Sequence, residues 1–378
     1  LGTSIWGSTE VGVRIFGIVS VGVAVLCLLW RGVQAENRQL LCLLLVATPL
    51  LFFGGVLATP DVPLVVAWIA ALLLAKEKAW GWTGVALGLA VLSKATGWVL
   101  WPALLLAHIR SAPRGVLVAW GVGLLVCMPH LFWLVEHDFV SFIYQAQRRG
   151  SSGGWVGLLN LLGGQFLMVG PVLCCAGFAY WVRGRDRDFR WWSSVLLLVV
   201  VLVSALKGRS EPNWLAPVWL GTFWALSEAR GRLRKAAWAG GWLAASATGL
   251  AFAHVISPLW DLPKDPLDRV HMGKTIGEAV EAWGVEKAVT RRYQEAAWIE
   301  FYGGIEATTI PDVGRQDQFD LWREELPTEG VYVRRLGSDS EPEAASYYKE
   351  VGERGRVLAR RKNRVVAGWE VYRVSSPR

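Results

Sequence analysis

The chain is poor in cysteine, with five thiols in 378 residues and none after residue 256. All five fall within apolar segments, and no CxxC spacing of the metal-binding kind is present: Cys27, Cys42, Cys127, Cys174 and Cys175. The sequence therefore indicates neither a disulfide framework nor a structural zinc site. The polar C-terminal third also lacks GxGxxG and P-loop patterns, so no nucleotide-binding motif is recognised there.

Charged residues are sparse before residue 256, where long apolar runs dominate. The chain is 53% hydrophobic with a mean hydropathy of +0.34, which is too apolar for an ordinary soluble domain and too charged for a wholly membrane-embedded protein. From Asp261 onward the sequence is polar. We therefore expect a multi-span transmembrane domain at 1–256 and a soluble α/β domain at 257–378.

Hydropathy predicts nine membrane segments and a shorter tenth: 11–30, 39–57, 62–75, 82–93, 95–109, 115–134, 160–181, 191–206, 236–256 and, the shorter one, 214–227. Several of the 23 tryptophans lie at segment ends, as interfacial belts require: Trp30, Trp101, Trp133, Trp181, Trp191, Trp214 and Trp260. Four segments are shorter than the roughly 20 residues of a standard span. They predict tilted, broken or re-entrant helices inside a bundle.

Basic residues are distributed unevenly between the two sets of alternating loops. If all ten segments cross, one set carries most of them: Arg31, Arg38, Lys76, Lys78, Arg110, Arg114, Arg183, Arg185, Arg187, Arg190, Arg230, Arg232, Arg234 and Lys235. The opposite set carries Arg148, Arg149, Lys207 and Arg209. The positive-inside rule makes the first set cytoplasmic and places the C-terminal domain in the periplasm or outside a bacterial cell. The net charge of +8 is thus attributed to basic residues of the cytoplasmic loops, which fix the membrane topology, and no nucleic-acid partner is expected.

Lys94 interrupts one of the most apolar stretches, LAVLSKATGWVLWP at 89–102. A cation in hydrocarbon costs about 2.5–3.5 kcal/mol, so a bundle partner, a water-filled cavity or an anionic ligand must offset this cost. Ser93, Thr96 and Gly97 weaken a helix at this point. We therefore predict that Lys94 lies at a break between two short helices.

The remaining unusual polar residues fall mostly on the predicted outer face. Four loops supply them. Asp61 lies in TPDVP, and Lys94 lies in SKATG. The EHDF stretch carries Glu136, His137 and Asp138 and is followed by Arg148 and Arg149, and KGRSEPNW carries Lys207, Arg209, Glu211 and Asn213. Arginine forks and a lysine ammonium suit a lipid-linked phosphate. Carboxylates beside them could deprotonate an acceptor hydroxyl or hold a divalent cation, which is left open as a cofactor.

These residues also have ordinary structural interpretations. Asp61 in a TPD turn is typical of a turn or helix-capping residue. His137 and Asp138 could belong to a solvated loop, and Arg148 and Arg149 could bind anionic lipid head groups. Lys94 is the hardest to explain in this way, because no solvated surface is available to it within its apolar segment.

Seven stretches in order resemble the bacterial family 39 glycosyltransferases, which are related to protein O-mannosyltransferases and lipid A aminoarabinose transferases. The stretches are LGTSIWGSTEVGVRI, TPDVPL, GLAVLSKATG, EHDFVSF, KGRSEPNWLAPVW, RYQEAAWIEFYG and DQFDLW. The resemblance implies a GT-C fold and inverting transfer of a sugar from a polyprenyl-phosphate donor to a glycolipid or protein acceptor at the outer face of the bacterial inner membrane.

The same resemblance implies roles for individual residues. Lys94 would hold the donor phosphate, with Arg148, Arg149, Lys207 and Arg209 as further candidates, and Asp61, His137, Asp138, Glu211 and Asn213 would contact sugar, acceptor or metal. The main catalytic acid of the family lies in an outer loop expected upstream of Leu1, so the chain is expected to be N-terminally truncated and no catalytic residue is named. A transporter or flippase for an anionic lipid-linked substrate is the alternative, and a membrane anchor for the C-terminal domain is a third.

Within the C-terminal domain, patterning predicts helices at 273–284, 294–303 and 343–351. Strands are expected at 287–292 and 330–336, followed by two closing strands in GRVLARR and GWEVYRV. A small α/β sandwich follows from this order, and acceptor recognition is the function expected of it.

Overall fold

The structure is a computed structural model that describes residues 2–140, 143, 153–184, 187–208, 210–260, 265–310, 319, 322, 325–337, 343–362 and 364–378. It divides into two compact units, Leu1–Leu250 and Ala251–Arg378. We describe each unit by itself.

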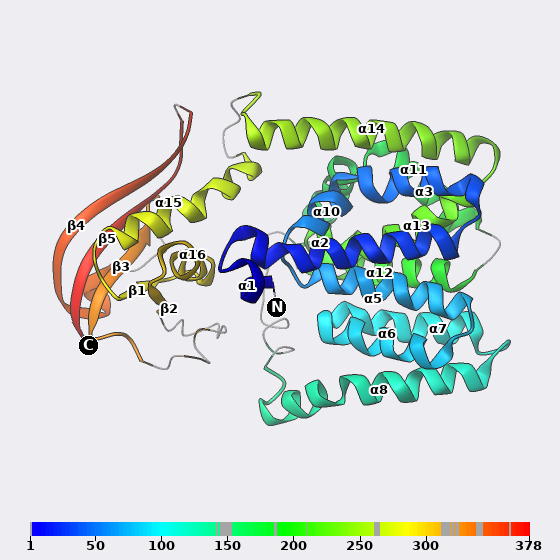
Figure 1. Cartoon of the computed structure of the whole chain (residues 1–378), viewed down its shortest axis with the longest axis horizontal. Helices are drawn as coiled ribbons and strands as arrows, with labels where there is room; N and C mark the ends of the chain where they lie inside the picture. The colour runs from blue at the N-terminus through cyan, green and yellow to red at the C-terminus, as the bar shows by residue number, and fades with distance from the viewer. Residues whose placement is uncertain are drawn as a thin grey trace. The chain divides into compact units, whose positions relative to one another are not determined.

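Unit 1 is helical (Figure 1). Its α-helices are α1 (Gly2–Trp6), α2 (Glu10–Cys27), α3 (Ala35–Ala47), α4 (Pro49–Val56), α5 (Asp61–Lys76), α6 (Trp80–Ser93), α7 (Leu100–His108), α8 (Pro113–Glu136), α10 (Trp155–Met168), α11 (Pro171–Arg183), α12 (Phe189–Leu206), α13 (Ala216–Glu228) and α14 (Gly231–Ile256), whose last turns belong to unit 2. A π-helical turn, η1 (Leu28–Gly32), extends α2, and the 3₁₀ turns η2 (Ala95–Val99) and η3 (Pro212–Leu215) precede α7 and α13.

Four helices are long and apolar enough to cross a membrane: Glu10–Gly32, α8, α12 and α14. Two bent pairs, α3 with α4 and α10 with α11, raise the number to six if each pair is one span. The membrane segments predicted at 39–57 and 160–181 thus each contain a break, where the paired helices bend by 65° and 113°. Proline opens the second helix in each case, at Pro49 and Pro171, and the preceding Gly170 has a positive φ of 98°.

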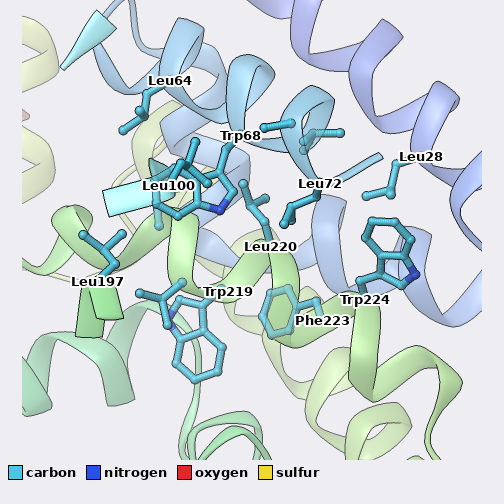
Figure 2. Packing of buried hydrophobic residues seen from close by; sticks show 14 of the residues in the cluster. Leu28, Leu64, Trp68, Leu72, Leu100, Leu197, Trp219, Leu220, Phe223 and Trp224 are labelled. Atoms are coloured by element: carbon cyan, nitrogen blue, oxygen red, sulfur yellow. The ribbon is translucent and has the colours of Figure 1, made fainter. Parts of the chain in front are cut away.

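Large aromatic and aliphatic side chains fill the centre of unit 1. Trp68 of α5 and Trp219, Phe223 and Trp224 of α13 are almost wholly buried and lie among leucines of neighbouring helices (Figure 2). Their burial favours a bundle in which α5 and α13 are interior helices, which explains how they can be shorter than a standard span.

Small residues allow α6 and α8 to approach closely. A Cβ added at Gly84 would lie 2.4 Å from the carbonyl oxygen of Ala119, and one at Gly88 would lie 2.6 Å from Cβ of Val126. Spacing of four residues puts Gly84 and Gly88 on one face of α6, the small-xxx-small arrangement of close membrane helix pairs. This contact fixes α6, and with it the position of the residue that follows its last turn.

Unit 2 contains a five-stranded sheet of order β2-β1-β3-β5-β4. The strands are β1 (Lys287–Thr290), β2 (Glu306–Thr309), β3 (Glu329–Arg335), β4 (Tyr348–Arg361) and β5 (Arg364–Pro377), and the helices are α15 (Arg269–Glu281) and α16 (Tyr293–Gly303). The first three strands are parallel, and β5 pairs antiparallel with β3 and β4. Both helices pack on the sheet face that carries Trp369 and Val371 of β5 (Figure 1).

Most elements predicted for the C-terminal region are present, but the helix predicted at 343–351 is wrong. Only a short 3₁₀ turn (Ala344–Ser346) forms there, and β4 begins at Tyr348. Tyr348 is fully buried in a second small core with Tyr332 and Val374. Tertiary packing of this aromatic side chain thus overrides the local helical pattern. The short strand β2 was not predicted.

Candidate functional site

Asp61 begins α5, directly after Thr59 and Pro60. A carboxylate in the first turn of a helix interacts favourably with the positive end of the helix dipole. The TPD turn therefore places Asp61 at one end of unit 1, whereas Lys76, the last residue of the same helix, lies at the other end.

Lys94 lies between α6 and η2 with an extended backbone (φ −163°, ψ 143°), so the predicted break between two short helices is confirmed. After Lys94 the chain folds back against the end of α6. A Cβ added at Gly97 would lie 2.3 Å from the carbonyl carbon of Ala90, so this approach requires glycine. The SKATG stretch thus leaves the Lys94 side chain at the end of the helix rather than in its middle.

Asp61, Lys94 and Asn213 meet at this end of unit 1, although they are far apart in the sequence. The Lys94 Nζ lies 2.6 Å from Asp61 Oδ1, and the Asn213 Nδ2 donates a hydrogen bond of 2.9 Å to Asp61 Oδ2. The side chains of Lys94 and Asp61 are 24% and 13% exposed. A bundle partner therefore offsets much of the cost of burying the Lys94 cation.

An aromatic ring and a buried amide support this group. The Lys94 Nζ lies 5.7 Å from the centre of the Trp214 ring, within cation–π range. Gln165 of α10 donates to the carbonyl oxygen of Pro212 (2.8 Å) and accepts from Trp219 Nε1 (2.9 Å). Gln165 therefore holds the PNW turn against α10 and α13, and this turn carries Asn213.

The three side chains keep unused hydrogen-bonding capacity. A lysine ammonium has three N–H donors, and Asp61 takes one of them. Each Asp61 oxygen has two acceptor sites and is bound to one described donor. The group can therefore bind a phosphate oxygen through Lys94 and a sugar hydroxyl through Asp61 while remaining intact.

Other predicted site residues lie elsewhere or outside the described residues. Lys207 and Glu211 are exposed residues between α12 and η3, and Asn213 lies in η3 itself. Arg148, Arg149 and Arg209 lie outside the described residues.

His137 and Asp138 are not joined to Asp61, Lys94 or Asn213 by any ion pair or hydrogen bond between described residues. The ring of His137 stacks on Trp133, with centroids 4.3 Å apart, and its Nδ1 lies 2.9 Å from the carbonyl oxygen of Trp133. His137 and Asp138 thus follow Glu136, the last residue of α8, and both are exposed, which agrees with the solvated-loop interpretation.

Several cations at the opposite end of unit 1 have partners among the described residues. Arg190 bonds Asp188 (2.7 Å) and Glu228 (2.6 Å), and Arg31 bonds Glu77 (2.6 Å). Arg234 of α14 donates to Asn37 Oδ1 (2.7 Å). Sequence patterning treated these arginines only as topological charges. Asp188 is two residues from Arg190, but Glu228, Glu77 and Asn37 lie 38 to 197 positions from their arginines, and no local spacing connects residues of such distant helices.

The sequence also missed two supporting residues. Trp214 was assigned to an interfacial belt, and Gln165 was given no role. The available signal for Gln165 was its amide inside the apolar segment 160–181, where Asn160 at the start of the segment is the other side-chain amide. Within the described part of the chain, no group of three or more His, Cys, Asp or Glu side chains is arranged to hold a metal ion.

Comparisons with known proteins agree with this architecture. A family profile described as dolichyl-phosphate-mannose-protein mannosyltransferase matches residues 1–133. The lipid A galacturonosyltransferase RgtD of Rhizobium johnstonii is 27% identical over 147 residues, covering 35% of this chain and 31% of RgtD. The match thus spans about a third of that relative's length.

Two crystal structures of ArnT from Cupriavidus metallidurans share the fold. The apo form superposes with a TM-score of 0.62 at 14% identity, and the form bound to undecaprenyl phosphate with a TM-score of 0.60 at 13% identity. Each alignment covers 98% of this chain and 85% of the ArnT chain. The resemblance read from the seven sequence stretches is confirmed: the chain is similar to family 39 glycosyltransferases and shares the GT-C fold of ArnT.

Proposed function

We propose that the protein is a membrane glycosyltransferase that takes a sugar from an undecaprenyl-phosphate-linked donor. The single observation that carries the proposal is the Asp61–Lys94–Asn213 group, built on a fold shared with an ArnT structure that binds undecaprenyl phosphate. A cation with free donors beside a sugar-binding carboxylate at the end of a helical bundle suits a lipid-linked sugar phosphate.

In this proposal Lys94 binds the donor phosphate, and Lys207, Arg148, Arg149 and Arg209 are further candidates for the same task. The Lys94–Asp61 pair is neutral as a whole, so additional cations are needed to attract an anion strongly. Lys207 follows the last residue of α12 in the connection to η3, where Asn213 lies, which favours it among the described candidates.

Transfer with inversion requires an acceptor oxygen to bond to the anomeric carbon as the bond from that carbon to the phosphate oxygen breaks. The electron pair leaves with the phosphate, where Lys94 stabilises the developing charge. Asp61, held by Lys94 and Asn213, would orient a hydroxyl of the donor sugar. The acceptor proton passes to a base that we do not assign to a described residue.

The location of the reaction is part of the proposal. With the arginine-rich end of unit 1 in the cytoplasm, the Asp61–Lys94 end and unit 2 face the periplasm of a bacterial inner membrane. Alkaline phosphatase fused after Arg378 should be active in cells, and an equivalent green fluorescent protein fusion should be dark. The reverse pattern would invert the topology and contradict this location.

Binding of undecaprenyl phosphate to the purified protein in nanodiscs tests the donor assignment. We expect Lys94→Gln to weaken binding about tenfold, because a charged hydrogen bond to phosphate is lost. Lys78→Gln, which removes the same charge from the opposite end of the bundle, should bind normally. Equal affinity in the Lys94 and Lys78 variants would refute the assignment.

A flippase for the same lipid would also bind it. The two functions separate when labelled donor is supplied only on the Asp61 side of the membrane. A glycosyltransferase consumes the donor there and releases undecaprenyl phosphate, whereas a flippase moves the intact donor across the bilayer.

A further inference from the structure

The two described α-helices of unit 2, α15 and α16, lie on one face of the sheet, and the second small core with Ala344 and Tyr348 covers the Tyr332 and Val374 part of the other face. Trp369 and Val371 of β5 point toward α15 and α16, and because side chains alternate along a strand, Glu370 and Tyr372 lie on the opposite face. The strand register places Arg334 of β3 and Arg356 of β4 directly across from Glu370 on either side. Three neighbouring strands therefore present charged side chains in one row on the face opposite α15 and α16.

Glu370 is surrounded by more positive charge than it can neutralise. Its Oε1 bonds the guanidinium of Arg354 and lies 3.7 Å from that of Arg356, and its Oε2 accepts from the Tyr372 hydroxyl at 2.7 Å. The Tyr372 hydrogen bond lowers the pKa of Glu370 below its ordinary value; burial opposes this, and Arg354 and Arg334 add to it. One carboxylate thus stands against three guanidinium groups.

The two outer guanidinium groups remain accessible. The Arg354 and Arg356 side chains are 57% and 61% exposed, whereas Glu370 is 8% exposed. Arg354 also lies over the Tyr372 ring at 5.5 Å, which fixes its orientation. The Nε of Arg334 is buried and has no hydrogen-bond partner among the described residues. The row of Arg334, Arg354 and Arg356, here termed the arginine row, therefore combines fixed geometry with unused donors.

The local charge is opposite in sign to that of the rest of the unit. Residues 348–378, which contain β4 and β5, carry nine Lys and Arg against three Asp and Glu, whereas residues 251–378 as a whole carry 19 against 21. Charged residues on an edge strand such as β4 protect against strand pairing between molecules. That function explains exposed arginines on β4 but not Arg334 on the central strand β3.

We propose that the arginine row is a binding site for a phosphorylated saccharide. Guanidinium forks bind phosphate oxygens in a bidentate manner, and two exposed forks two residues apart on β4, beside one carboxylate, suit a ligand with more than one phosphate oxygen pair. Tyr372 beside them is partly exposed and, apart from the ring area that Arg354 covers, can contact a sugar ring. The assignment of this saccharide as the acceptor rests on the proposed glycosyltransferase function, but its binding does not.

The test uses the full chain in phosphatidylcholine nanodiscs, with glucose 1,6-bisphosphate as probe and glucose as the neutral control. We expect the bisphosphate to bind, glucose not to bind, and affinity to fall as salt is raised. Arg354→Gln/Arg356→Gln should weaken bisphosphate binding at least tenfold. Lys274→Gln/Lys287→Gln, which removes the same charge from exposed sites on α15 and β1, should stay within twofold of the unmodified protein.

A second variant gives an effect of opposite sign. Glu370→Gln removes the competing carboxylate charge while keeping side-chain shape, so bisphosphate binding should become several-fold tighter even if thermal stability falls. A purely structural role for the row would weaken binding in both variants or leave it unchanged, and either result would overturn the proposal.

Anionic lipid head groups could supply the same chemistry. Hydrogen exchange along β4 separates the two sources when phosphatidylglycerol nanodiscs are compared with phosphatidylcholine nanodiscs. Protection by the bisphosphate supports the saccharide site, and protection by phosphatidylglycerol alone rejects it. Undecaprenyl phosphate binding, measured in parallel, should be normal in the Arg354/Arg356 variant, so failure of this site and failure of the donor site can be told apart.

Discussion

The Lys94 ammonium and the Asp61 carboxylate lie 2.6 Å apart, and they join the end of α6 to the start of α5. The pair makes the lysine a structural residue as well as a candidate ligand. We expect Lys94→Gln and Asp61→Asn each to lower the thermal unfolding temperature, because each leaves one partly buried charge without its partner.

A double-mutant cycle measures the strength of this pair. The double variant should be less destabilised than the sum of the two single variants, with a coupling free energy of about 1–3 kcal/mol. Additive effects, measured by thermal unfolding in the same detergent, would show that the two side chains do not interact.

Asn213 should act on ligand binding through Asp61. Asn213→Ala removes one hydrogen bond from Asp61 Oδ2 and should weaken undecaprenyl phosphate binding severalfold through loss of orientation. Asn213→Asp places a second carboxylate beside Asp61 and should weaken binding further, because like charges repel each other and a phosphate. An aspartate variant that binds better than the alanine variant would contradict this role.

Close packing of α6 on α8 predicts a large cost for added volume. Gly88→Val should lower the unfolding temperature strongly, since the new side chain meets Val126 with no room to move, and overpacking costs about 1–3 kcal/mol. Gly22→Val is a matched control in α2, where nothing lies within 4 Å of an added Cβ. Equal stability of the two variants in a thermal unfolding assay would show that the helices are not in close contact.

The sequence predicted the architecture better than the site. Apolar runs and the break at Lys94 follow from local composition, so they could be read directly, and the family resemblance followed from short motifs. The pairing of Asp61 with Lys94 and Asn213 could not be read, because these two residues are 33 and 152 positions from Asp61 and reach it only through packing. The same reason explains why Gln165 was missed.

A buried cluster in unit 2 predicts a pH dependence of stability. Asp265 Oδ2 lies 2.6 Å from His254 Nε2 and 3.4 Å from Arg361 Nη1, and the Leu267 N–H donates to Oδ1 at 2.9 Å. Burial raises the pKa of Asp265, but the Leu267 and His254 hydrogen bonds and the charge of Arg361 outweigh it, so the pKa lies below its ordinary value.

A lowered carboxyl pKa contributes stability above the unfolded-state pKa of about 3.9, and this stability is lost as pH falls through the folded-state value. Asp265→Asn should therefore destabilise unit 2 at pH 7, and its difference from the unmodified protein should shrink below about pH 4. Hydrogen exchange of α15 and β4 across this range measures the effect. A difference that stays constant with pH would argue against an ionised Asp265.

Gln165 gives the PNW turn a fixed shape before any substrate arrives. Its amide binds the turn through Pro212 and is itself fixed by Trp219, deep in the bundle. Mobility of the Asn213 segment is thus already lost when the protein folds, and little further ordering should oppose docking of the lipid. If the proposed donor binds here, binding should follow a single kinetic phase, because no loop closure is needed to complete the site.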